Sequence, residues 1–172
     1  IHHITVDPDE VGPGTLFIAR RAWWGNQHLA LERVRQAGAA AVVVSETGHD
    51  TRWPAAGPPL WQVEADDPFL GQICDRFYNA PTARLSVFGV TGTNGKTSTV
   101  SLLDRCLAAL GERPASMGTL GYTFQGHRVP ATNTTPDAIV IQRFAADCLQ
   151  LGATALALEV SSHGLDLQRV AG

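Results

Sequence analysis

The feature that most limits what this chain can fold into is the segment Gly89–Thr99, which reads GVTGTNGKTST. It follows the apolar run Leu85–Val90 and leads into Lys96–Leu110, where apolar residues recur at helical spacing. A buried strand, a glycine-rich turn and a helix in this order are typical of a phosphate-binding loop. Glycines let backbone N–H groups turn inward towards phosphate oxygens, and the helix N-terminus adds positive potential. The segment therefore predicts an α/β fold with a nucleotide phosphate site.

The spacing of this loop departs from the strict form G-x-x-x-x-G-K-[ST], which requires glycine where Val90 stands. An ordinary glycine-rich turn with a chance Gly-Lys-Thr is the alternative interpretation. In the functional interpretation, Lys96 supplies charge for the β- and γ-phosphates and the Thr97 hydroxyl is a ligand for Mg²⁺. The predicted ATP contacts are Gly92, Thr93, Asn94, Gly95, Lys96, Thr97 and Ser98.

Strands and helices are predicted to alternate along the chain, which indicates parallel sheets with right-handed crossovers. The predicted strands are 15–19, 40–44, 60–63, 85–90 and 154–160. The predicted helices are 29–37, 67–78, 96–110 and 136–151, with a hairpin over 120–129. The segment Asn79–Thr82 marks the predicted boundary between two domains, 1–80 and 81–172.

The composition of the chain is that of a globular protein, with 44% apolar and 17% charged residues. The formal net charge of −3 argues against a nucleic-acid-binding surface. No apolar run reaches the roughly 18 residues of a spanning helix, so no membrane partner is expected. No secretory signal is visible, although the chain does not begin with Met. The three cysteines form no C-x-x-C pattern and are expected to act as small apolar residues in a reducing compartment.

Three motifs together resemble the Mur ligase family, the ATP-dependent ligases that add amino acids to the peptidoglycan precursor. The first is GVTGTNGKTS, and the second is Asn133–Pro136, which resembles the family's NTTP segment. The third, Glu159–Val170 (EVSSHGLDLQRV), resembles the MurE type, which adds the third residue of the stem peptide. The stretches VGPGTLFIA and 38–44 resemble the family's N-terminal UDP-binding domain. The resemblance covers nearly the whole chain, and implies a small UDP-binding-type α/β domain followed by part of a P-loop ATPase-like parallel-sheet domain.

The resemblance implies a bacterial cytoplasmic enzyme that joins diaminopimelate or lysine to UDP-MurNAc-L-Ala-D-Glu through an acyl phosphate, with ATP and Mg²⁺ as cofactors. Lys96 and Glu159 are the expected catalytic residues, and Thr97 and Glu159 the expected metal ligands. Glu159 ends a predicted strand, where open parallel sheets place ligands; a solvated strand-end acid is the alternative. The expected substrate contacts are Val6, Trp23, Trp24, Gly25, Asn133, Thr134, Thr135, Ser161 and Arg169.

Several of these residues have a second interpretation. Thr135 fits a helix N-cap, with Pro136 at the first helical position. His163 is interpreted as structural rather than as a metal ligand, because the family's metal histidine lies further downstream. Arg20-Arg21 and Trp23-Trp24 fit phosphate pairing and base stacking, or an aromatic pair beside surface charge.

Two departures from the family pattern leave the function partly open. Asp7-Pro8-Asp9 stands where the family has Asp-Ser-Arg, so a serine hydroxyl and a guanidinium are missing. The sequence also lacks the downstream histidine, the modified lysine and the C-terminal domain of the family, so it is expected to be a fragment that is inactive alone. The alternatives are therefore a Mur-like ligase for another carboxylate and a non-catalytic nucleotide-binding fragment.

Overall fold

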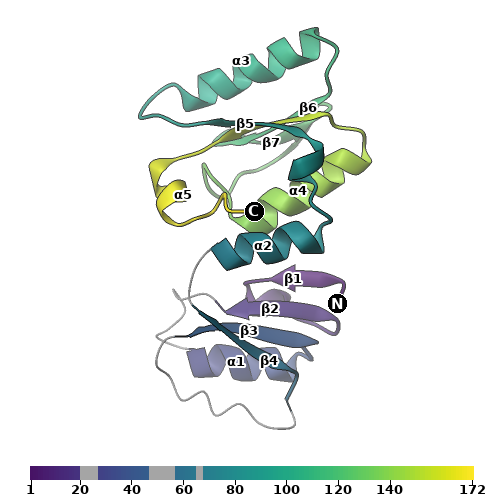
Figure 1. The fold of residues 1–172 in the computed structure, drawn as a ribbon, viewed down its shortest axis with the longest axis vertical. Coiled ribbons are helices and arrows are strands. Elements are labelled where there is room, and N and C mark those ends of the chain that lie inside the picture. The colour runs from purple at the N-terminus through teal and green to yellow at the C-terminus, as the bar shows by residue number, and fades with distance from the viewer. Residues whose placement is uncertain (20–26, 47–56, 65–67) are drawn as a thin grey trace. The chain divides into compact units, whose positions relative to one another are not determined.

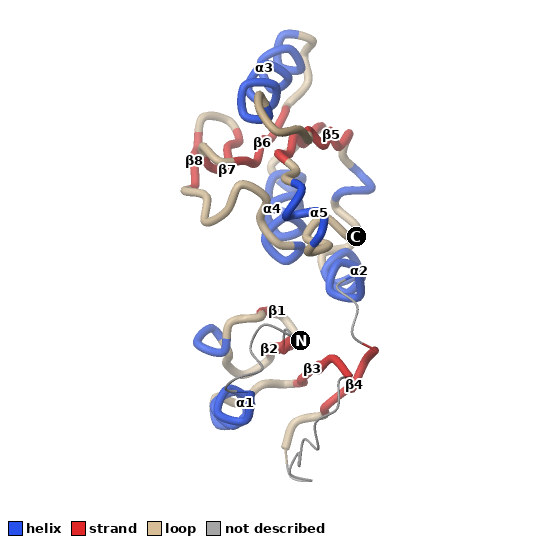
Figure 2. Tube along the Cα trace, turned by 90° about the vertical axis from the view of Figure 1, so that its left-hand side faces the viewer, coloured by secondary structure: helices blue, strands red, loops and turns tan. Residues whose placement is uncertain are grey.

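The computed structural model describes residues 1–19, 27–46, 57–64 and 68–172. These residues form two compact units, Ile1–Asp66 and Asp67–Gly172. Figure 1 shows the elements of each unit as a ribbon, and Figure 2 shows the same trace from the side. Among the described helices, none has the length and apolar character needed to cross a membrane.

The first unit is a parallel sheet with strand order β1-β2-β3-β4. Its strands are β1 (His3–Thr5), β2 (Thr15–Ala19), β3 (Ala41–Glu46) and β4 (Leu60–Glu64). Helix α1 (Gln27–Gln36) packs Leu31 and Val34 against Phe17 and Val42. Gly38 follows the helix at φ +82°, a conformation that suits glycine at a helix end. The predicted strands at 15–19, 40–44 and 60–63 and the predicted helix at 29–37 are confirmed to within about two residues.

The second unit is a mixed sheet with strand order β5-β9-β6-β7-β8. Its strands are β5 (Ser86–Val90), β6 (Pro114–Gly118), β7 (Gly121–Phe124), β8 (His127–Val129) and β9 (Ala155–Glu159). Strands β5, β9 and β6 run parallel, whereas β7 and β8 run antiparallel to their neighbours. The helices are α2 (Pro68–Phe77), α3 (Lys96–Ala109), α4 (Ala138–Gln150) and α5 (Ser162–Asp166). Figure 1 shows α3 on one face of this sheet and α4 on the other.

The core of the second unit lies between the sheet and α4. Met117 of β6, Leu156 of β9 and Ala145 of α4 are fully buried in one cluster. Burial of apolar side chains of this size stabilises a fold by roughly 1.5–3 kcal/mol each. This core holds β9 between β5 and β6, and the carboxyl end of β9 carries Glu159.

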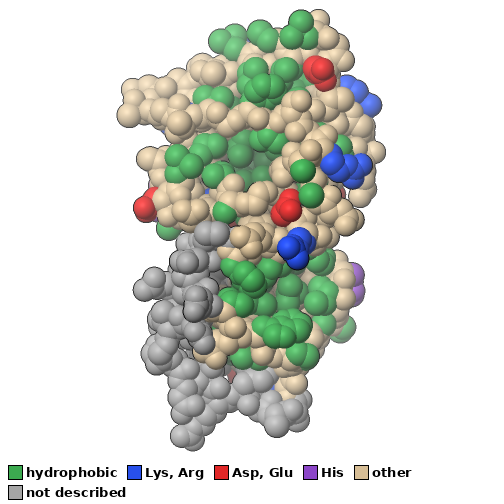
Figure 3. All heavy atoms as spheres, viewed as in Figure 1, with side chains coloured by type: hydrophobic (Ala, Val, Ile, Leu, Met, Phe, Trp, Pro, Cys, Tyr) green, Lys and Arg blue, Asp and Glu red, His purple; other side chains and the backbone are tan. Residues whose placement is uncertain are grey.

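Three expectations for this unit were wrong in detail. Strand β6 was not predicted, because its sequence, PASMG, lacks the β-branched and aromatic residues that favour strands. Strand β5 was expected to be buried, yet it is the edge strand of the described sheet, with Val87 44% and Phe88 37% exposed. Figure 3, viewed as Figure 1, shows apolar side chains exposed on the visible surface of this unit. Leu110, the last residue of the predicted helix 96–110, is instead the C-cap of α3 and is 80% exposed.

Helix α2 belongs to the second compact unit, where it packs against α4. The sequence places the domain boundary at 80/81, whereas the compact units divide at 66/67. The difference arises because α2 packs against α4 of the second unit. Two of the cysteines, Cys74 and Cys148, are buried, and Cys106 is exposed on α3. Burial raises the pKa of the Cys148 thiol to about 12, so this thiol is neutral at physiological pH.

Candidate functional site

The glycine-rich loop, residues 91–95, connects the carboxyl end of β5 to the start of α3. Gly92 has φ +146° and Gly95 has φ +81°, conformations that L side chains rarely adopt. Gly95 is also the N-cap of α3, and it has no side-chain oxygen to accept from the first-turn N–H groups. Those donors are therefore left for an external acceptor, and the loop itself is exposed. The predicted strand–loop–helix order is confirmed.

Lys96, the first residue of α3, folds back over this loop. Its Nζ donates to the carbonyl oxygen of Gly92 at 2.7 Å and lies 3.5 Å from that of Thr93. The ammonium group is thus held at the mouth of the loop by neutral acceptors. A phosphate oxygen forms a stronger, charge-assisted bond with an ammonium group than a carbonyl does. The geometry allows Lys96 to exchange these carbonyls for a phosphate.

Glu159, at the end of β9, is 1% exposed, so the alternative of a solvated strand-end acid is wrong. Its Oε2 accepts from Thr97 Oγ1 at 3.0 Å, and its Oε1 accepts from the backbone N–H of Thr119 at 3.0 Å. Of the ion pairs formed between described residues, none includes Glu159. A buried carboxylate without a cation is costly, so this arrangement fits a site that receives one.

The space beside Glu159 is a polar cavity of about 170 Å³. Thr97, Gly118 and Glu159 line it, which brings together the two residues predicted to hold the metal. Within the described ranges, no three side chains of His, Cys, Asp or Glu gather into a metal cluster. Mg²⁺ is commonly held by one or two protein oxygens, several waters and the substrate's phosphates. One carboxylate and one hydroxyl beside a phosphate loop fit that pattern.

Thr135 lies inside the fold, 1% exposed, and ties the segment before α4 to the end of β9. Its hydroxyl donates to the carbonyl oxygen of Glu159 at 3.0 Å and accepts from the backbone N–H of Ser161 at 2.8 Å. The guanidinium of Arg169 donates to the Thr135 carbonyl at 2.9 Å. The Thr135 hydroxyl already makes these internal hydrogen bonds and is buried. The direct substrate contact expected from the resemblance therefore does not fit the structure.

Thr135 is not a helix N-cap either. Helix α4 begins at Ala138, and its N-cap is Asp137, whose Oδ1 accepts from the backbone N–H of Val140 at 3.2 Å. Pro136 therefore lies before the helix rather than at its first position. The N-cap interpretation is wrong because the helix begins two residues later than expected, which puts Asp137 at the N-cap position.

Replacement of Thr135 by valine is expected to lower the free energy of unfolding of the second unit by about 2–6 kcal/mol. Valine keeps the shape but leaves the Glu159 carbonyl and the Ser161 N–H without their buried partner, at about 1–3 kcal/mol each. Urea unfolding followed by circular dichroism measures the change. Thr132→Val, at an exposed position, is the matched control. A loss below about 0.5 kcal/mol for Thr135→Val would contradict the role of this hydroxyl.

Other predicted substrate residues lie around this network. Thr134 Oγ1 is 3.1 Å from Thr119 Oγ1, and Asn133 is exposed. Ser161 is the N-cap of α5, where its Oγ accepts from the Gly164 N–H at 3.0 Å. His163 is exposed on α5 and makes no side-chain hydrogen bond to a described residue, so the structure supplies no structural role for it.

The predicted UDP-side residues belong to the first unit. Val6 is half-buried after β1, whereas Trp23, Trp24 and Gly25 lie outside the described residues, as do Arg20 and Arg21. In the departure Asp7-Pro8-Asp9, Asp7 caps a short 3-10 helix by accepting from the Asp9 N–H at 2.9 Å. The Asp7 side chain therefore stabilises this turn of the chain itself.

Sequence reasoning missed Thr119, which donates hydrogen bonds to Glu159, and Gly118, which directly precedes Thr119 in the chain. No strand was predicted before them, so nothing in the sequence placed them beside the end of β9. A Cβ added at Gly118 would lie 2.1 Å from Glu159 Oε1, so only glycine fits there without movement. Register between β6 and β9 is what brings these residues together.

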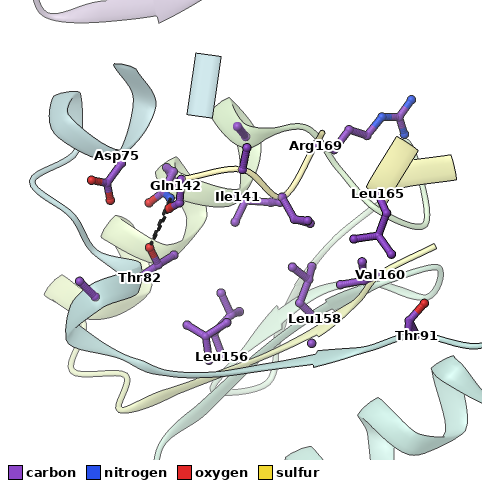
Figure 4. Close-up of a pocket in the computed structure, with 17 residues that line it drawn as sticks. Asp75, Thr82, Thr91, Ile141, Gln142, Leu156, Leu158, Val160, Leu165 and Arg169 are labelled. Carbon is purple, nitrogen blue, oxygen red and sulfur yellow. Dashed lines mark hydrogen bonds between the residues drawn. The ribbon is translucent and has the colours of Figure 1, made fainter. Parts of the chain in front are cut away.

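A second, larger cavity of about 660 Å³ lies on the α4 face of the sheet. Figure 4 shows Leu156, Leu158 and Val160 pointing into it, while the guanidinium of Arg169 points away. Gln142 Oε1 is buried there without a hydrogen-bond partner, although its Nε2 lies 3.3 Å from Thr82 Oγ1. The mainly apolar wall makes this cavity unsuited to a triphosphate, so the polar site on the α3 face is the candidate phosphate site.

Comparison with known proteins points to the same family as the sequence motifs. Residues 90–172 match the family model described as the Mur ligase middle domain. The UDP-N-acetylmuramoyl-L-alanyl-D-glutamate–2,6-diaminopimelate ligase of Pseudomonas aeruginosa (strain PAO1) is 42% identical over 173 residues, which cover 99% of this chain and 35% of that protein. The chain therefore spans about a third of the length of such relatives.

Solved structures extend the likeness to the fold. A structure of a UDP-N-acetylmuramoyl-L-alanyl-D-glutamate–2,6-diaminopimelate ligase matches with a TM-score of 0.85 at 29% identity, covering 100% of this chain and 34% of the other. The MurF ligase of Thermotoga maritima, solved with ADP, matches with a TM-score of 0.54 at 18% identity, covering 94% and 32% of the two chains. The latter likeness shows the fold alone. Taken with the matched middle domain, these relatives show that the chain belongs to the Mur ligase family.

Proposed function

We propose that this chain is the nucleotide-holding part of an ATP-dependent ligase that joins an amino acid to a carboxylate of a UDP-linked peptidoglycan precursor. The observation that carries the proposal is the contact between Thr97 and the buried Glu159 at the end of the glycine-rich loop. It places a hydroxyl and a carboxylate, both ligands suited to Mg²⁺, directly beside N–H donors suited to a triphosphate.

In this proposal, the residues of the site neutralise and position the charges of ATP. Lys96 and the N–H groups of the loop would hold the β- and γ-phosphates of ATP, with Thr93, Asn94 and Ser98 around them. Thr97 and Glu159 would hold Mg²⁺, which offsets the charge of the transferring phosphoryl group. Transfer of the γ-phosphoryl group to the substrate carboxylate gives an acyl phosphate, and attack by an amine then forms the amide bond and releases phosphate.

The relatives' names suggest the finer substrates, UDP-MurNAc-L-Ala-D-Glu and diaminopimelate, with lysine as the alternative amino acid. Asn133, Thr134, Ser161 and Arg169 surround the end of β9 and would face the muramyl-peptide part, with Val6, Trp23, Trp24 and Gly25 on the UDP side. Such ligation consumes ATP and UDP-linked precursors, which places the proposed activity in the bacterial cytoplasm. No nucleic-acid or membrane partner is part of this proposal.

A ligase for another carboxylate is the second candidate, and Asp7-Pro8-Asp9 is the observation that favours it. Pro8 is buried and Asp7 caps the turn, so neither supplies the hydroxyl or guanidinium that the family places there. Comparing UDP-MurNAc-L-Ala-D-Glu with other UDP-linked acids as substrates of the longer protein decides between the two. A non-catalytic fragment is the third candidate, and it shares the nucleotide-binding step.

Nucleotide binding by the chain can be tested on a single side chain, because Lys96 is the one lysine in the sequence. We expect MgATP to slow acetylation of Lys96 by an amine-reactive ester at least about 10-fold, since the bound phosphates would engage the ammonium group. Peptide mass spectrometry measures the modified fraction, and the α-amino group of Ile1 is the internal control. Equal acetylation of Lys96 with and without millimolar MgATP would sink the proposal.

A further inference from the structure

The carboxylate of Glu159 is held by three hydrogen bonds, and two of them come from one residue. Thr119 donates its backbone N–H to Oε1 at 3.0 Å, and its Oγ1 lies 3.2 Å from Oε2. Thr97 supplies the third bond, to Oε2 at 3.0 Å. Thr119 therefore contacts both oxygens of the carboxylate. These two contacts fix the rotation of the Glu159 carboxylate about its Cγ–Cδ bond.

The direction of the Thr119 hydroxyl follows from its neighbours. Thr119 Oγ1 lies 3.1 Å from Thr134 Oγ1 as well as 3.2 Å from Glu159 Oε2. Thr119 Oγ1 carries a single proton, and both Thr134 Oγ1 and Glu159 Oε2 lie within reach of it as acceptors. A hydrogen bond to an ionised carboxylate is stronger than one to a neutral hydroxyl, so the proton is used for Glu159.

Gly118 lies directly against the same carboxylate, next to the Oε1 atom that accepts from Thr119. A Cβ at this position would lie 2.1 Å from Oε1 and 2.5 Å from Cδ of Glu159, inside any real contact distance. Since Glu159 is 1% exposed, its side chain has little room to move away. The bare backbone of Gly118 therefore allows the approach that the Thr119 N–H requires.

We propose that Thr119 is a positioning residue that aims the Glu159 carboxylate at the cation, with Gly118 providing the clearance. The inference rests on the proposed function, in which Glu159 and Thr97 hold Mg²⁺ with ATP. The three donors occupy three of the roughly four acceptor positions of the carboxylate, which leaves one on Oε1. Donors behind a metal-ligating group commonly change metal affinity by about 10- to 100-fold when removed.

The test is the affinity of the 172-residue chain for a non-hydrolysable ATP analogue, measured by calorimetry with Mg²⁺ and again with EDTA. The ratio of the two affinities is the magnesium-dependent gain. Thr119→Val removes the hydroxyl and keeps the backbone N–H, and we expect it to lower the gain about 10-fold while the affinity in EDTA stays within about 2-fold. Thr119→Ser restores the hydroxyl and should retain the gain.

Thr154→Val is the matched control, because the Thr154 hydroxyl bonds the Glu112 carboxylate just before the amino end of β9, whereas Glu159 lies at the carboxyl end of that strand. Gly118→Ala tests the same positioning independently, should Thr119→Val fail to fold by circular dichroism. It is expected to lower the gain at least as much. An unchanged gain in Thr119→Val or, in that case, in Gly118→Ala would overturn the inference, as would equal losses with Mg²⁺ and EDTA.

Failure of the proposed function has a different signature. If the unmodified chain shows no magnesium-dependent gain and Glu159→Gln changes nothing, the metal site itself is wrong and the inference falls with it. If Glu159→Gln lowers the gain but Thr119→Val does not, the metal site stands and only the positioning role of Thr119 is lost.

Discussion

Replacing Lys96 by alanine is expected to lower the rate of ATP-dependent ligation by at least about 100-fold in the longer protein that contains this chain. Lys96 is at the first position of α3, with its Nζ held at the mouth of the loop by the Gly92 carbonyl. Loss of one preorganised charge contact to the transferring group typically costs 100- to 1,000-fold in rate. Release of phosphate in the presence of ATP, precursor and amino acid measures the effect.

The control for this change is Arg143→Ala, which removes one positive charge from an exposed position on α4, away from the loop. It is expected to leave the rate within about 2-fold. Lys96→Arg keeps the charge but spreads it over a planar group, so it should recover part of the activity. Turnover in Lys96→Ala equal to that of the unmodified enzyme would show that the loop does not hold the reacting phosphates.

Glu159→Gln is expected to raise the Mg²⁺ concentration needed for half-maximal activity at least about 10-fold, while the metal-free protein melts at the same temperature or higher. Glutamine is nearly the same size but is not an anionic ligand for a hard cation. In the metal-free fold, the change removes a buried charge that no described cation pairs, and removing such a charge is often neutral or stabilising. The magnesium requirement is therefore predicted to rise while the melting temperature of the metal-free protein does not fall.

Glu112→Gln is the matched control, because Glu112 is exposed and bonds the Thr154 hydroxyl well outside the loop. It should change neither the magnesium requirement nor the melting temperature appreciably. If Glu159→Gln destabilises the protein strongly and leaves the magnesium response intact, Glu159 is a structural residue, and the metal assignment is wrong.

Local sequence was sufficient for the phosphate loop. The glycines at 92 and 95 adopt the positive φ angles that other residues avoid, and α3 begins at the lysine that follows them. The turn of the predicted hairpin was also readable, since Gln125 and Gly126 both have positive φ between β7 and β8. These features depend on backbone preferences of a few consecutive residues, which the sequence states directly.

Features that depend on pairing between distant segments were not readable in the same way. Strand β6 has a weak sequence for a strand and exists because β9 and β7 pair with it on both sides. Thr135 looked like an N-cap or a substrate contact, and its burial against Glu159 and Ser161 follows from the approach of β9. Both errors come from tertiary contacts that outweigh local preference.

The sequence by itself determined the order of strand, loop and helix, the lysine and hydroxyl placed at the start of α3, and the family to which its motifs belong. Only the tertiary structure decided that Glu159 is buried, that it meets Thr97 across 62 positions of sequence, and that Thr119 holds it. The physical reason is the separation along the sequence of the residues that interact. Backbone conformation is set by neighbouring residues, whereas burial and the partners of a carboxylate are set by strand register and by the packing of helices on the sheet.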